Sequence, residues 1–146
     1  MSIQLLCVSH KTADTKIRGL FAFDDDAKAR IMERLISSPY INEAVLLATC
    51  NRTELYCEVR EKTETAVLFM QQNSEIQDVI LRYEEKKAVH HLFMVAAGLD
   101  SVVLGEDQIL GQVKNAYLAS DKKGYIGNSF HSLFQAAMAA AKKVKT

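Results

Sequence analysis

Hydrophobic and polar residues follow two kinds of pattern along this chain, short strand-like runs and longer stretches with helical spacing. Ala44–Ala48 is continuously apolar, which is typical of a buried strand, and Glu54–Val59 alternates in type, as a half-buried strand does. Two further short runs, Ile3–Val8 and Val79–Tyr83, also predict strands.

Helical spacing separates these runs in a regular order. Asp25–Ile36 carries an apolar stripe at every fourth residue and follows Asp24, which can cap a helix, and Thr63–Gln72 predicts a second helix. The order strand, helix, strand, strand, helix, strand predicts an α+β fold with a ferredoxin-like βαββαβ antiparallel sheet.

The rest of the sequence predicts only helices. They cover Glu85–Ala97, Glu106–Lys122 and Asn128–Lys145, each with apolar residues on one face. We therefore expect one domain over residues 1–146, with a ferredoxin-like part at 1–84 and a C-terminal helical extension at 85–146.

The polar segment between the second and third predicted strands is the first candidate for chemistry. It reads Thr49-Cys50-Asn51-Arg52-Thr53 and places a thiol at the mouth of a strand. A guanidinium near Cys50 favours the ionised thiol, which is the nucleophilic form. The alternative is a tight turn whose cysteine is buried and inert, but the polar surroundings favour a reactive site.

The helical part offers two weaker candidates. His91 lies beside an apolar stripe, where a histidine is more often a satisfied boundary residue than a catalytic one, and His90 is expected at the surface. Gln108 and Gln112 share a helix face and follow Glu106, a pattern that suits a polar substrate but also a capped, solvated helix.

Composition narrows the class of protein. The 146 residues have no net charge, so no global attraction to nucleic acid is expected. No apolar run approaches the roughly 20 residues that span a bilayer. Three cysteines without a CxxC pair favour a reducing, cytoplasmic location and argue against a disulfide framework or a zinc site.

Two stretches closely resemble the glutamyl-tRNA reductase family. They are Thr49–Glu54 (Thr-Cys-Asn-Arg-Thr-Glu) and Gly98–Val113, and the resemblance runs from Ser9–Ala13 to Phe134–Lys143. Members of this family begin tetrapyrrole (haem) biosynthesis by the five-carbon route. The resemblance implies that the chain is the family's N-terminal catalytic domain and binds glutamyl-tRNA.

The same resemblance implies roles for individual residues. Cys50 matches the nucleophile that attacks the aminoacyl ester of glutamyl-tRNA, giving a thioester that NADPH reduces to glutamate-1-semialdehyde. His91 matches the family's active-site histidine, for proton transfer or for orienting the ester. Arg52 is the natural partner for a carboxylate of the glutamyl group, and Glu106 is the natural partner for its ammonium group. The residues matching the substrate-binding region are Thr49, Asn51, Arg52, Ser101, Glu106, Asp107, Gln108 and Gln112.

The sequence predicts no cofactor site within this chain, because its six glycines never form the GxGxxG motif of a dinucleotide site. It predicts no metal site, because the three cysteines form no CxxC pair. In the full-length family enzyme the resemblance implies NADPH bound by a further domain and a homodimer formed through a third. It also implies a contact with the next enzyme of the pathway. We therefore expect this chain to form the thioester without reducing it.

Two other classes of function fit some of these features. A tRNA-acceptor binding module would need only clustered positive charge. The candidate lysines for such an edge are Lys114, Lys122, Lys123, Lys142, Lys143 and Lys145. A Cys–His thiol esterase would hydrolyse small esters without tRNA. A reactive Cys50 separates both enzyme hypotheses from the binding module.

Overall fold

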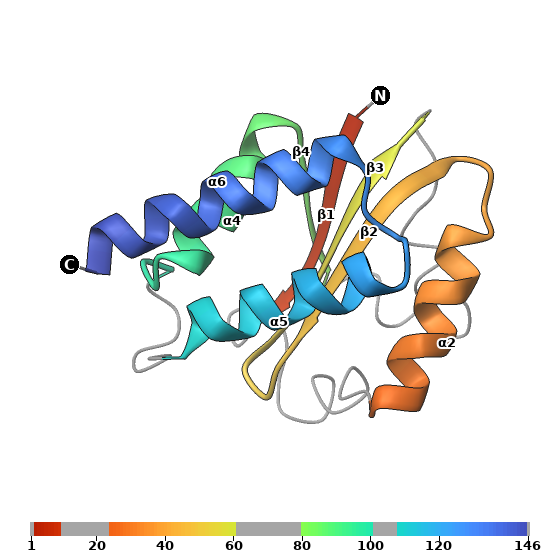
Figure 1. Ribbon diagram of the computed structural model, residues 1–146, viewed down its shortest axis with the longest axis horizontal. Helices are drawn as coiled ribbons and strands as arrows, with labels where there is room; N and C mark the ends of the chain where they lie inside the picture. Colours follow the sequence, from red (N-terminus) through yellow and green to blue (C-terminus); the bar gives the residue numbers. More distant parts are fainter. Residues whose placement is uncertain (1, 10–23, 61–79, 101–107, 146) are drawn as a thin grey trace.

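A four-stranded antiparallel sheet forms the centre of the protein (Figure 1). The structure is a computed structural model, and it describes residues 2–9, 24–60, 80–100 and 108–145. The strands are β1 (Ser2–Ser9), β2 (Ile41–Ala48), β3 (Arg52–Val59) and β4 (Leu81–Glu84), in the order β2-β3-β1-β4. The predicted ferredoxin-like antiparallel sheet is confirmed.

Helices cover both faces of this sheet. The face that carries Leu5, Val45 and Tyr56 packs against α4 (Lys86–Ala96), α5 (Ile109–Lys122) and α6 (Asn128–Lys145). The opposite face packs against α2 (Asp25–Ile36). The C-terminal helices therefore share one hydrophobic core with the sheet. Among the described residues, no helix is both long and apolar enough to cross a bilayer.

Helix α2 shows how directly local sequence sets an element. The Asp24 carboxylate accepts a hydrogen bond of 2.8 Å from the Ala27 N–H, as an N-cap side chain does. The helix ends at Ile36, and the Ser37 hydroxyl donates to the Arg34 carbonyl. Both the predicted range and the predicted cap are confirmed.

The third strand differs from its prediction in two respects. It begins at Arg52, so the connection from β2 is only Thr49–Asn51, and all eight of its residues are buried. The prediction of a half-buried strand is wrong because helices cover the face that its polar residues occupy. Glu54 therefore contacts His91 of α4, and Glu58 contacts Ser129 of α6, rather than water.

Other boundaries shift by a few residues. Strand β4 ends at Glu84, and α4 starts at Lys86 after Glu85, whose φ of 53° turns the chain into the helix. The predicted helix at 63–72 and the predicted start of α5 at 106 lie outside the described residues.

Candidate active site

Cys50 is exposed at the tip of the hairpin between β2 and β3. The Thr49 hydroxyl accepts from the backbone N–H groups of Asn51 and Arg52, both at 3.2 Å, and the Thr49 N–H donates to the Arg52 carbonyl at 2.8 Å. Such a side-chain-closed turn is a compact, well-defined conformation. The hairpin therefore presents the thiol to solvent on a fixed backbone.

Arg52 points into the protein rather than lying in a flexible connection. Its side chain is fully buried, and its Nη1 donates to Glu54 Oε2 at 2.9 Å and to Asp100 Oδ2 at 2.8 Å. Asp100 follows α4 and is 20 % exposed, whereas Glu54 is inaccessible. The guanidinium thus joins the hairpin to the end of α4.

Glu54 is the centre of this network. Its Oε1 accepts from the Tyr56 hydroxyl at 2.6 Å, and its Oε2 lies 2.7 Å from His91 Nε2. Burial by itself would raise the pKa of Glu54, but the His91 hydrogen bond and the charges of His91 and Arg52 lower it below its ordinary value. A fully buried carboxylate is thereby kept ionised.

Cys7 closes the network from β1 and is a different kind of cysteine from Cys50. Its Sγ lies 3.5 Å from Glu54 Oε2 and 3.9 Å from His91 Nε2. Burial, then the charge of Glu54, raises the pKa of the Cys7 thiol, and burial alone raises that of Cys57. Both buried thiols are therefore poor nucleophiles.

The Cys7, Glu54 and His91 atoms lie close enough together to be considered as metal ligands. However, the Arg52 guanidinium already contacts the same carboxylate oxygen at 2.9 Å. A metal cation there would face a permanently charged side chain at short range, which is unfavourable. The arrangement suits an ion-pair network better than a metal centre.

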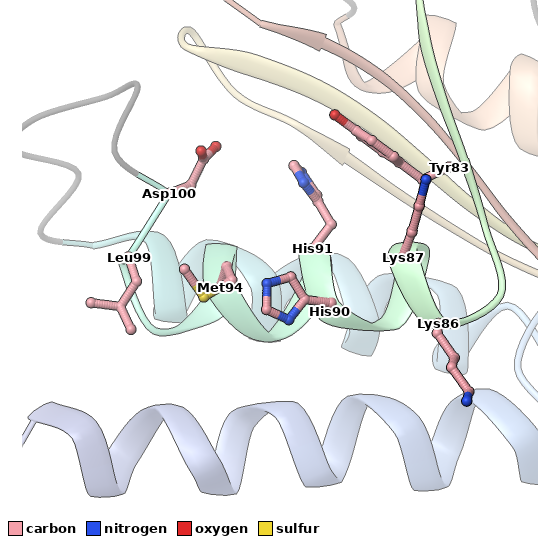
Figure 2. Close-up of a pocket in the computed structure, with 8 residues that line it drawn as sticks. All are labelled: Tyr83, Lys86, Lys87, His90, His91, Met94, Leu99 and Asp100. Carbon is pink, nitrogen blue, oxygen red and sulfur yellow. The ribbon is translucent and has the colours of Figure 1, made fainter.

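A pocket of about 590 Å³ borders His91 (Figure 2). The Tyr83 and His91 rings stack with centroids 5.4 Å apart and an interplanar angle of 22°. Asp100 lies along the same side, and Figure 2 shows Lys86, Lys87 and His90 projecting from the first turns of α4. An aromatic pair beside basic groups suits an anionic, base-containing ligand.

The structure brings together some of the residues predicted from sequence. Arg52 and His91 meet through Glu54, while Thr49 and Asn51 build the turn that carries Cys50. Gln108 and Gln112 are exposed at the start of α5, and His90 is exposed as predicted. Ser101, Glu106 and Asp107 lie outside the described residues.

Sequence reasoning missed Glu54, Asp100 and Tyr83 as members of the site. The sequence signal for Glu54 was a charged residue at an alternating strand position beside Arg52. Its partner His91 is 37 residues away in sequence, and only the packing of α4 on the sheet shows the pairing.

Comparison with known proteins shows which family this chain belongs to. Residues 6–146 match the model of the family described as "Glutamyl-tRNAGlu reductase, N-terminal domain". The chain belongs to this family. Every residue predicted above for catalysis or substrate binding falls within the matched range.

Named glutamyl-tRNA reductases resemble the chain over its whole length. The protein from Xylella fastidiosa strain M12 is 41 % identical over 146 residues, and that from Shewanella frigidimarina is 42 % identical over 151 residues. Each alignment covers 100 % of this chain, and 34 % and 36 % of the two relatives. The chain therefore spans about a third of the length of these relatives.

The solved structure of glutamyl-tRNA reductase from Methanopyrus kandleri has the same fold in the shared part. It superposes with a TM-score of 0.73 at 28 % sequence identity, over 98 % of this chain and 34 % of that one. The sheet and helices of this chain are thus those of the reductase family's N-terminal domain.

Proposed function

We propose that this chain is the acyl-accepting domain of a glutamyl-tRNA reductase and that Cys50 is its nucleophile. The observation that carries the proposal is the exposed thiol on a fixed hairpin in a domain of this family. The other two thiols are buried, and the pKa of each is raised. Cys50 is therefore the cysteine that can meet a macromolecular substrate.

The proposed reaction is transfer of the glutamyl group from tRNA to sulfur. The ionised Cys50 sulfur attacks the ester carbonyl carbon, and a carbon–sulfur bond forms as the bond from that carbon to the ribose oxygen breaks. The ribose oxygen takes up a proton, so the products are free tRNA and a glutamyl thioester. His91 is proposed to assist by moving that proton or by orienting the ester. A positioned acid–base group raises the rate of such a reaction by about 10²–10⁴-fold.

Arg52 is proposed to bind a carboxylate of the glutamyl group from one direction. The Glu54 side of the guanidinium is fully buried, whereas Asp100 is partly exposed. An incoming carboxylate can therefore approach on the Asp100 side while Glu54 keeps the arginine in place. The remaining predicted contacts, from Thr49, Asn51, Ser101, Glu106, Asp107, Gln108 and Gln112, stay predictions.

The tRNA end is proposed to lie along the pocket beside His91. Its rim carries Lys86, Lys87 and His90, and charge of this kind contacts phosphates, while an aromatic ring such as Tyr83 can stack on a base. A matched pair of variants tests this placement. Lys86→Ala/Lys87→Ala should weaken binding of glutamyl-tRNA about tenfold, and Lys142→Ala/Lys143→Ala should not. The reverse result would place the tRNA on α6.

Reduction of the thioester by NADPH is proposed to require a further domain of the enzyme. The described sheet is antiparallel, unlike the parallel βαβ sheets that bind dinucleotides at their switch point. We therefore assign the hydride step to the two-thirds of the relatives that this chain does not span. A homodimer, a contact with the next enzyme of the pathway and a cytoplasmic location stay predictions.

Alkylation of Cys50 tests its proposed role. The chain is treated with iodoacetamide, and labelling at each cysteine is followed by mass spectrometry. Cys50 should react fastest. Glutamyl-tRNA should protect Cys50 from alkylation more strongly than deacylated tRNA does. Equal protection by charged and uncharged tRNA would favour the binding module, and protection by small glutamyl esters alone would favour the thiol esterase.

A further inference from the structure

We propose that Glu54 is a positioning residue that fixes His91 with its proton on Nε2, so that Nδ1 is the nitrogen His91 offers to the substrate. The inference rests on the proposed function and specifies the atom through which His91 takes part in it. Nothing in the sequence motifs distinguishes the two ring nitrogens.

The hydrogen-bond inventory of Glu54 determines the location of this proton. Its Oε1 accepts from the Tyr56 hydroxyl, and its Oε2 accepts from Arg52 Nη1 and, at 3.5 Å, from the Cys7 thiol. An ionised carboxylate has no proton to donate, so at 2.7 Å from Oε2 the His91 Nε2 must be the donor. The lowered pKa of Glu54 agrees with an ionised carboxylate in this position.

The remaining ring nitrogen is then defined by elimination. When the imidazole is neutral and Nε2 carries its proton, Nδ1 is an acceptor. The His91 side chain is 17 % exposed, and it borders the pocket in Figure 2, whereas Glu54 is fully buried. Nδ1 can therefore exchange a proton with a ligand without breaking the Glu54 bond.

Two contacts keep the His91 imidazole ring from flipping. Tyr83 stacks on the imidazole, and Arg52 holds the Glu54 oxygen that His91 uses. A flip of the ring would put the carbon Cε1 where Nε2 meets Glu54 and leave that buried anion short of a donor, which is costly. The same logic applies to a histidine oriented by a buried aspartate in hydrolytic triads.

The tautomer can be measured without any substrate. In the ¹⁵N-labelled chain, long-range ¹H–¹⁵N spectra above the titration range of histidine should show His91 Nε2 as the protonated nitrogen and Nδ1 as the unprotonated one. The spectrum of His91→Gln identifies the signals. Observation of the Nδ1–H tautomer would overturn the inference.

The rate of Cys50 acylation tests whether the tautomer matters for chemistry. His91→Gln places an amide where Nε2 meets Glu54 but has nothing at Nδ1, so it should keep the fold and lose acylation by about 10²–10⁴-fold. Glu54→Gln removes the anion beside the ring, and it should move the pH midpoint of acylation to lower pH. A wild-type rate in His91→Gln, or an unchanged pH profile in Glu54→Gln, would contradict the proposal.

The outcomes separate this inference from the proposed function. If Cys50 is acylated but His91 carries its proton on Nδ1, the inference fails alone. If the wild-type chain binds glutamyl-tRNA without acylation of Cys50, the proposed function fails whatever the tautomer.

Discussion

Two buried glutamates on β3 show how the same kind of residue is used in opposite ways. Glu54 and Glu58 lie on the same face of the strand and are 0 % and 7 % exposed. Glu54 accepts hydrogen bonds from the Tyr56 hydroxyl, the Arg52 guanidinium and His91 Nε2, and its pKa is lowered. Burial, followed by the hydrogen bond and the charge of Glu43, raises the pKa of Glu58 to about 7.

The second region serves the fold rather than the site. The Glu43 carboxylate accepts from the backbone N–H groups of Gly127 and Phe130, at 2.5 Å and 2.9 Å, and so holds the start of α6. A side chain at Gly127 would approach this carboxylate to 3.2 Å, which is tighter than ordinary contact. With Glu58 protonated, the pair shares one charge at a helix N-terminus, where a negative charge is favourable.

The comparison shows that the partners of a buried carboxylate decide whether the effect of burial on its pKa prevails. Burial acts on both glutamates in the same direction, against the charged form. The hydrogen bond from His91 and the charge of Arg52 keep Glu54 ionised, which allows it to hold both side chains. Burial, and then the acidic partner Glu43, raise the pKa of Glu58 to about 7, so that Glu58 takes up and releases a proton near neutral pH.

Removing each carboxylate should give the largest difference. Glu54→Ala leaves Arg52 and Tyr56 without a buried partner, and the free energy of unfolding should fall by about 3–5 kcal/mol. Glu58→Gln keeps a hydrogen-bonding group and removes an unfavourable charge, so at pH 7.5 it should leave stability unchanged or raise it. Urea unfolding followed by circular dichroism measures both, and equal losses would show that the two sites are alike.

The pH dependence of stability should separate the two glutamates by sign. The Glu58 pKa is raised to about 7 in the folded chain from an ordinary 4.5, so its contribution is complete below pH 4.5 and is lost as the pH rises through 7. The wild-type free energy of unfolding should therefore fall by up to about 3 kcal/mol between pH 5 and 8.

Two variants provide the controls for this pH effect. Glu58→Gln should flatten the decrease between pH 5 and 8. Glu54 has a lowered pKa, so its contribution is present above its ordinary value and is lost as the pH falls through the folded value. A steeper decrease in Glu58→Gln than in the wild type would contradict the assignment.

The smallest expected effect concerns the helix that Glu43 holds. Glu43→Ala leaves the N–H groups of Gly127 and Phe130 without their acceptor, and it should lower the free energy of unfolding by about 1 kcal/mol. Amide hydrogen exchange should increase in the first turn of α6. Exchange that increases equally in α2, whose cap is Asp24, would mean that the loss is global.

Sequence periodicity was sufficient for much of the fold. The ferredoxin-like order, the Asp24 cap of α2 and the range of α6 all follow from local spacing, because strands and helices bury residues at fixed intervals. The same reasoning placed Arg52 in a loop and left Glu54 without a role. Polar residues inside a strand contradict simple periodicity, and their partners come from a helix that the local pattern cannot place.

The site itself was predicted in part. Cys50 was identified from its polar neighbours, and its exposure on a hydrogen-bonded hairpin agrees with a reactive thiol. The link between Arg52 and His91 through Glu54 depends on contacts across 37 or more residues. Such contacts follow from packing rather than from spacing along the chain.

Mass spectrometry of the chain mixed with glutamyl-tRNA and rapidly quenched in acid tests the central claim most directly. The account predicts one glutamyl group on Cys50, none on Cys7 or Cys57, and none in Cys50→Ser, with a matching amount of free tRNA. Bound glutamyl-tRNA whose ester stays intact, or a glutamyl group attached to any other residue, would contradict it.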